Sequence, residues 1–201
     1  LYVLSKSDGM IRQLAAVMTL PPEEPSPALE VRITTSADDA EEKASGKVLL
    51  TNGTLKLESS QTVGLRFTSV SIPRGATIQR VWVQFTAGKR ESKATVLTIK
   101  GQAVDHASPF TTMIKNLSSR AKTTAAVSWS PEPWTVVGEA GLKQRTPDLA
   151  GIIQEVVSRP GWSNGNALAL IITGTGLRTA RSFNGDANGA PFLYVEYASA
   201  P

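Results

Sequence analysis

Short runs in which apolar and polar side chains alternate recur along the chain from residue 29 onward. In TIQRVWVQFTA (77–87), Val81, Val83 and Phe85 fall on one side, and mostly polar residues fall on the other. A period of two is typical of β-strands that bury one face. Further runs of this kind occur at 29–35, 63–70, 95–104, 166–174 and 191–198.

Turn-forming residues separate these runs. The segments IPRGA, NGT, SNGN and NGDANG combine Gly, Asn and Pro, which supply the backbone conformations that tight turns need. Many short strands with turn signals between them predict an all-β chain. We expect an antiparallel β-sandwich of the jelly-roll type.

One amphipathic helix interrupts the β pattern, in TPDLAGIIQEVVSRPGW (146–162). Thr146 stands where an N-cap belongs, Pro147 suits the first helical position, and Pro160-Gly161 stops the helix. Its apolar residues recur at helical spacing and predict one buried face, formed by Leu149, Ile152, Ile153, Val156 and Val157. We expect this helix to cover one end or edge of the sandwich.

A proline-rich segment divides the chain into unequal parts. LPPEEPSPA (20–28) holds four prolines in nine positions, which favours a stiff, extended linker. We therefore expect three parts: an N-terminal hairpin at 1–19, a linker at 20–28, and the sandwich module at 29–201. The hairpin is interpreted as a remnant of a preceding domain. The chain begins without Met or a signal peptide, which suggests a fragment of a longer protein.

Composition narrows the function classes. A chain of 201 residues with 41% hydrophobic and 19% charged residues is typical of a globular protein with one core. A net charge of +4 without a dense Lys/Arg run does not favour nucleic-acid binding, although weak attraction to an acidic polymer stays open. The absence of cysteine excludes disulfides and cysteine metal sites, and no apolar run is long enough to span a membrane.

Several segments together resemble the DNRLRE-type β-sandwich domains, which are similar to carbohydrate-binding modules. These are LRFTSVSIPRGATIQRVWVQF (65–85), SWSPEPWT (128–135), TPDLAGIIQEVVSRPGWSNGNALALIITGTG (146–176) and RSFNGDANGAPFLYVEYA (181–198). The resemblance covers roughly residues 30–198. It implies a noncatalytic module of a secreted, extracellular or cell-surface bacterial protein, with acidic polysaccharides among the ligands.

The first residues carry a second resemblance. LYVLSKSDGMIRQL (1–14) is similar to the final strands of β-propeller sugar dehydrogenases that use pyrroloquinoline quinone. This resemblance implies that the chain follows a propeller domain in a larger protein. The alternative is a plain hairpin that docks on the sandwich.

Aromatic and arginine residues are the candidate ligand-binding groups. Sugars stack on exposed aromatic faces, and arginine grips carboxylate or sulfate groups through two hydrogen bonds. The expected strand at 77–87 carries a polar stripe of Arg80, Trp82 and Gln84 on the face opposite its apolar residues. Trp82 belongs instead to the core if a loop or the helix covers that face. Further candidates in loops and turns are Trp134, Arg178 and Arg181.

An acidic cluster lies in SADDAEEKASG (36–46), where Asp38, Asp39, Glu41 and Glu42 stand within five positions. We interpret it as a solvated loop after the first strand of the sandwich, with structural calcium as the alternative. Calcium prefers six to eight oxygen ligands. The turn FNGDANG (183–189) offers further oxygens, so the candidate metal ligands are Asp38, Asp39, Glu41, Asn184 and Asp186.

Catalysis has little support from the residues. The sequence has one histidine, His106, and no G-x-S-x-G nucleophile elbow, so a Ser-His-Asp triad has no support. The acidic cluster lacks the second carboxylate across a cleft that a glycosidase needs. We expect a noncatalytic extracellular module that binds polysaccharide or a cell-surface glycan and attaches a parent protein to a surface. The alternative is a structural domain that packs on a propeller or on other subunits without binding glycan.

Overall fold

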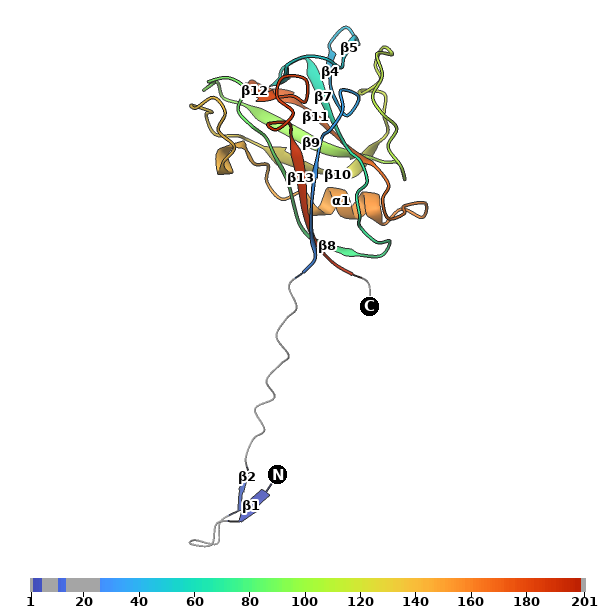
Figure 1. Cartoon of the computed structure of the whole chain (residues 1–201), viewed down its shortest axis with the longest axis vertical. Coiled ribbons are helices and arrows are strands. Elements are labelled where there is room, and N and C mark those ends of the chain that lie inside the picture. Colours follow the sequence, from blue (N-terminus) through green and yellow to red (C-terminus); the bar gives the residue numbers. More distant parts are fainter. Residues whose placement is uncertain (1, 5–10, 14–25, 200–201) are drawn as a thin grey trace.

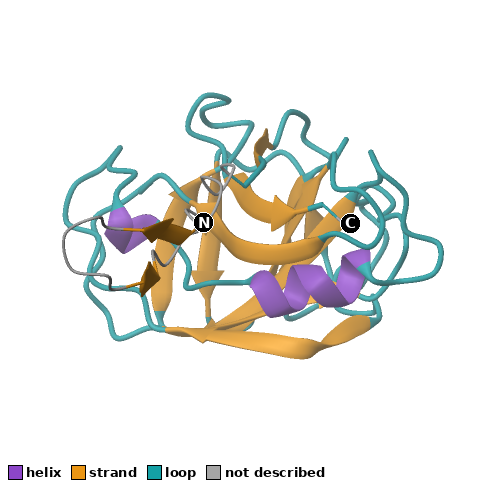
Figure 2. Cartoon of the chain, turned by 90° about the horizontal axis from the view of Figure 1, so that it is seen from below, coloured by secondary structure: helices purple, strands orange, loops and turns teal. Residues whose placement is uncertain are grey.

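The structure is a computed structural model that describes residues 2–4, 11–13 and 26–199. It is an antiparallel β-sandwich with one short α-helix (Figures 1 and 2), which confirms the fold class expected from the alternating runs. Near the N-terminus, β1 (Tyr2–Leu4) pairs antiparallel with β2 (Ile11–Gln13). The rest of the expected N-terminal piece and most of the proline-rich linker lie outside the described residues.

One layer of the sandwich is a six-stranded sheet with the order β10-β9-β11-β7-β4-β5. Its strands are β4 (Asp39–Lys43), β5 (Val48–Leu49), β7 (Gln61–Phe67), β9 (Val96–Gln102), β10 (Lys122–Trp129) and β11 (Leu168–Thr175). The other layer contains a three-stranded sheet with the order β3-β13-β8, formed by β3 (Ala28–Arg32), β13 (Phe192–Ala198) and β8 (Thr77–Gln84). A further pair joins β6 (Thr54–Glu58) to β12 (Leu177–Arg181).

The main core lies between the two layers. Val63, Leu65 and Phe67 of β7 face Val81 and Val83 of β8 within one buried cluster. Because side chains alternate along a strand, these residues leave their neighbours on the outer faces of the sandwich. A strand lies in each of the six alternating runs. Besides β1 and β2, the described residues contain five further strands that were not predicted from the sequence, namely β4, β5, β6, β10 and β12.

The helix α1 spans Ala150–Val157, which is shorter than expected. Thr146 is not its N-cap, because the Thr146 hydroxyl accepts a hydrogen bond from Val83 N instead. The segment before α1 runs alongside β8, with Leu149 N donating to Val81 O. The apolar face of α1 is buried as expected, and the helix contacts β8, β9 and β10. It therefore closes the sandwich edge between β8 and β10.

A loop covers part of the outer face of the six-stranded sheet. Phe110 and Leu117 of this loop form a second, smaller buried cluster with Ala40 of β4 and with Ala169 and Ile171 of β11. Within the described ranges, no helix is long and apolar enough to cross a membrane. The sandwich therefore presents two different outer faces. The loop partly covers one of them, and the other carries aromatic residues.

Candidate functional site

The outer face of the three-stranded sheet carries an aromatic pair. Trp82 of β8 lies directly opposite Tyr194 of β13 in the register, and their rings stack with centroids 4.0 Å apart and planes 17° apart. Both side chains are half-buried. Because Val81 and Val83 point into the core, Arg80 and Trp82 project outward together, as the alternation predicts.

Arg145 completes this stack from the other side. Its guanidinium carbon lies 4.5 Å from the centre of the Trp82 ring, and its Nε donates to Gln84 Oε1 at 3.2 Å. Two groups so close to one ring centre occupy opposite faces of it. The indole of Trp82 therefore lies between Tyr194 and Arg145, and it offers its edge, not a free face, to a ligand.

A cavity of about 300 Å³ opens beside this stack, lined by Arg80, Val81, Trp82, Arg145, Thr146 and Asp148. We call it the arginine pocket. Two guanidinium groups border it. Arg80 is exposed, and its Nη1 lies 3.8 Å from Glu196 Oε2, which is a loose ion pair. The Trp82 Nε1 is buried and meets no acceptor among the described residues.

One oxygen of the single carboxylate that lines the arginine pocket is engaged by the backbone. Asp148 Oδ1 accepts hydrogen bonds from Val81 N at 2.9 Å and from Ala150 N at 3.0 Å. These bonds tie the segment before α1 to the edge of β8. The two guanidinium groups outnumber this one carboxylate among the lining residues, and the resulting positive charge suits an anionic group.

The aromatic face continues along β13. Phe192 lies under the guanidinium of Arg32, which is 4.7 Å from the ring centre. The Tyr194 hydroxyl donates to Glu196 Oε1 at 2.9 Å, and this hydrogen bond is the main reason why the pKa of Tyr194 is raised. Phe192, Tyr194 and Trp82 thus form a half-exposed aromatic row whose two ends are each covered by an arginine.

Three of the predicted ligand-binding residues are buried and hold loops together. Arg178 is 1% exposed and donates to the carbonyls of Lys93, Pro131, Glu132 and Leu177, and its burial lowers its pKa. Trp134 is fully buried, and its Nε1 donates to Lys143 O. Gln84 is also buried and donates to Gly141 O. The expectation that these residues contact a ligand is therefore corrected: their polar atoms face the protein interior.

Arg181 is placed away from the arginine pocket. It belongs to β12, and its Nε lies 3.7 Å from Asp186 Oδ2. Of the six predicted residues, the structure brings only Arg80 and Trp82 to one accessible cavity. The residues that the sequence did not reveal are Arg145 and Tyr194, since each reaches Trp82 through contacts that no local pattern records.

The acidic cluster is not a solvated loop. Residues 39–43 form β4 inside the six-stranded sheet, and Asp38, Asp39, Glu41 and Glu42 are all less than 5% exposed. Burial of a charge is costly unless hydrogen bonds compensate it. Each of these four carboxylates is bound by a different part of the chain.

The four carboxylates act as anchors for distant segments. Asp38 forms a buried ion pair with Arg66, and Asp39 Oδ2 accepts from Phe183 N at 2.7 Å. Glu41 accepts from the side chain of Asn52 and from Lys56 N. Glu42 Oε2 accepts two backbone hydrogen bonds, from Leu117 N at 2.8 Å and from Ser118 N at 3.0 Å.

The two predicted metal-ligand segments do meet, through the hydrogen bond between Asp39 and Phe183. Asn184 is exposed, whereas Asp186 accepts from Asn188 N. Among the residues that the structure describes, no three His, Cys, Asp or Glu side chains gather so that they hold a metal ion. Calcium at these residues stays a prediction that calorimetric titration tests.

The pKa of the buried Asp39 departs strongly from its ordinary value. Burial raises its pKa to about 6; the nearby charges of Asp38 and Glu41 act in the same direction, and the Phe183 N–H acts against it.

His106 accepts a hydrogen bond from Ala167 N and contacts Asn166, which ties two loops together.

The comparisons with known proteins do not identify a relative. No protein-family model matches this sequence, and no curated protein matches it significantly.

Proposed function

We propose that this chain is a noncatalytic module that binds an anionic polysaccharide through the arginine pocket and the aromatic row beside it. The observation that carries this proposal is the convergence of two guanidinium groups and the side chain of Trp82 on one cavity of about 300 Å³. Arginine binds carboxylate and sulfate groups through paired, charge-assisted hydrogen bonds.

The rigidity of Arg145 supports this role. Its guanidinium is fixed by the stack on Trp82 and by the hydrogen bond to Gln84 Oε1. A side chain that is already ordered loses less conformational entropy when it binds a ligand. Arg80 is freer, because its ion pair with Glu196 is long and exposed, and such pairs contribute little.

The size of the pocket defines how a polymer binds. A cavity of about 300 Å³ lies at the lower end of the range for small-ligand sites, so it accommodates one acidic sugar residue and not a length of chain. The neighbouring sugars then lie along the half-exposed edges of Trp82, Tyr194 and Phe192. Attachment of a parent protein to an extracellular surface follows from such binding as part of the same proposal.

A structural role is the second candidate, and one observation favours it. Aromatic residues and arginine are enriched at protein interfaces, and the face around Tyr194 combines Trp82, Phe192, Arg32 and Arg145 with the nearby acids Glu30 and Glu196. A face that carries both arginines and acids suits a protein partner. A polyanion binds there only if the arginines contact it while Glu30 and Glu196 are kept away from it.

Affinity electrophoresis through gels that contain polygalacturonate, dextran sulfate or neutral dextran tests the proposal. We expect retardation by one or both anionic polymers and none by dextran; the two anionic arms distinguish carboxylate from sulfate recognition. The double variant Arg80→Gln/Arg145→Gln should lose about tenfold or more in affinity. The exposed Arg74, on a turn, provides the control Arg74→Gln, which removes one charge elsewhere. Equal losses in both variants would reduce the effect to net charge and contradict the proposal.

A further inference from the structure

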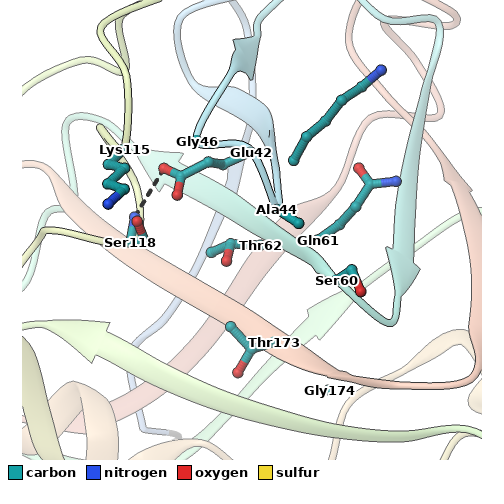
Figure 3. Close-up of a pocket in the computed structure, with 11 residues that line it drawn as sticks. Glu42, Ala44, Gly46, Ser60, Gln61, Thr62, Lys115, Ser118, Thr173 and Gly174 are labelled. Atoms are coloured by element: carbon teal, nitrogen blue, oxygen red, sulfur yellow. Dashed lines mark hydrogen bonds between the residues drawn. The ribbon is translucent and has the colours of Figure 1, made fainter.

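A second cavity, of about 370 Å³, lies on the opposite side of the sandwich, on the outer face of the six-stranded sheet (Figure 3). Polar side chains that line it are Glu42, Lys43, Ser60, Gln61, Thr62, Lys115, Ser118 and Thr173. We call it the hydroxyl cleft. It shares no residue with the arginine pocket, and the main core separates the two.

The hydroxyl cleft exists because the loop that covers this sheet ends there. Phe110 lies so close to the sheet that a Cβ atom on Gly64 would be 2.6 Å from its ring. Two residues along β7, Thr62 points to the same outer face but has no such cover. Lys115 and Ser118 of the loop form the facing wall, and Figure 3 shows them across from Thr62 and Glu42.

Glu42 both shapes the cleft and leaves an acceptor in it. Its Oε2 accepts hydrogen bonds from Leu117 N and from Ser118 N, which fixes the loop wall; the dashed line in Figure 3 marks the bond to Ser118. Within the described part of the chain, no donor is bonded to its Oε1. Lys43 and Lys115 add two cations to the lining of the cleft. The cleft therefore offers a ligand both hydrogen-bond donors and hydrogen-bond acceptors.

The strand register extends this arrangement across the sheet. Glu42 pairs with Thr62 in the β4–β7 register, and the pair Ile172–Val63 places Thr173 opposite Thr62. Thr173 pairs with Thr98 of β9, and Thr98 pairs with Ser128 of β10. Thr98, Ser128 and Thr173 are exposed. One carboxylate and four hydroxyl groups thus stand in a single row across five neighbouring strands.

The length and chemistry of this row indicate its ligand. Five strands at the usual spacing of about 4.8 Å give a row of about 19 Å. Hydroxyl groups donate and accept hydrogen bonds at once, as the hydroxyl groups of a sugar do. Apart from its cleft end, where Glu42, Lys43 and Lys115 carry charge, the row consists of uncharged hydroxyl groups, so it suits a neutral chain and not an acidic one.

We propose that the hydroxyl cleft and the row of Thr62, Thr173, Thr98 and Ser128 form a second binding site, for a neutral oligosaccharide. One sugar residue occupies the cleft, where its hydroxyl groups donate to Glu42 Oε1 and accept from Lys115, and the following residues lie along the row. This site is independent of the arginine pocket. The two outer faces then bind two different polysaccharides, one neutral and one anionic.

Titration of the isotope-labelled chain with cellotetraose, mannotetraose and xylotetraose, followed by NMR, tests this site. We expect at least one of these neutral probes to shift the backbone amide signals of Thr62, Thr98 and Thr173 in a saturable way. Thr62→Val and Thr173→Val retain the shape of the side chain and its preference for strands but remove the hydroxyl group. Each should weaken binding about fivefold or more, because a hydrogen bond contributes about 1 kcal/mol.

Thr77→Val is the matched control, since Thr77 is an exposed threonine of β8 in the other sheet. Neither this substitution nor Arg145→Gln should change the affinity for the neutral probe. The proposal is overturned if none of the three tetrasaccharides shifts these signals, if Thr62→Val and Thr173→Val bind as tightly as the unaltered chain, or if Arg145→Gln abolishes binding. If no neutral tetrasaccharide binds, the proposal for the hydroxyl cleft is wrong, whereas binding of polygalacturonate or dextran sulfate at the arginine pocket is decided by its own experiment.

Discussion

Arg145 and Trp82 are 63 residues apart in the chain, yet the guanidinium of one lies 4.5 Å from the ring centre of the other. The contact arises because the segment before α1 pairs with the edge of β8, where Gln84 and Arg145 form a β-bridge. It fixes the cation of Arg145 in the same cavity as Arg80. The proposed affinity for an anionic polysaccharide depends on this contact.

Removal of Asp38 should destabilise the sandwich strongly. Asp38→Ala leaves the buried guanidinium of Arg66 without its carboxylate, and loss of one partner of a buried ion pair costs about 3–5 kcal/mol. Urea denaturation measures the free energy of unfolding. The double variant Asp38→Ala/Arg66→Met removes the unpaired charge, and it should be more stable than the single variant. If the double variant is the less stable of the two, burial of an unpaired charge is not the cause.

The stability of the chain should depend on the ionisation of Asp39. Its pKa is raised from 3.8 to about 6 on folding, so the folded state binds the proton more tightly than the unfolded state. The contribution of Asp39 to the free energy of unfolding is therefore fully present below about pH 4 and decreases as the pH rises through 6, by at most about 3 kcal/mol.

Asp39→Asn isolates this effect, because the amide oxygen still accepts from Phe183 N and does not ionise. The variant should gain stability relative to the unaltered chain at pH 7 and much less at pH 4. Urea denaturation at both pH values measures the difference. A stability difference that is the same at pH 4 and pH 7 would show that the folded and unfolded states do not differ in the pKa of Asp39.

Two glycine substitutions should change stability in opposite directions. A Cβ atom at Gly64 would lie 2.6 Å from the Phe110 ring, so Gly64→Ala should cost about 1–3 kcal/mol through overpacking. At Gly151, inside α1, nothing lies within 4 Å of the added atom, and alanine favours a helix by about 1 kcal/mol over glycine. Gly151→Ala should therefore raise the melting temperature and Gly64→Ala should lower it. Equal shifts would contradict the close packing of the covering loop.

Strands with one apolar face could be predicted from the sequence, and β4 could not. In β8, the alternation of Val81 and Val83 with polar neighbours records which side faces the core. In β4, Asp39, Glu41 and Glu42 read as a polar loop because their partners are not local. Phe183 N, Asn52 and Leu117 N compensate these carboxylates only after the chain has folded.

The candidate site was predictable in part for a similar reason. Alternation along one strand is sufficient to place Arg80 and Trp82 on an outer face. It does not indicate that Arg145 and Tyr194 cover the two faces of the Trp82 indole, since both contacts are between distant segments. Trp134 and Arg178 lie in or beside loops and look exposed in the sequence, yet the surrounding carbonyl groups bind them in the interior.

The indole N–H signal of Trp82 gives the most direct test of the proposed function. We would assign this NMR signal with the variant Trp82→Phe and follow it during titration with trigalacturonic acid and with neutral maltotriose. The arginine pocket predicts that the signal moves with trigalacturonic acid only, and that Arg145→Gln abolishes the movement. A Trp82 signal that stays fixed while trigalacturonic acid binds elsewhere, or the absence of any binding, would contradict it.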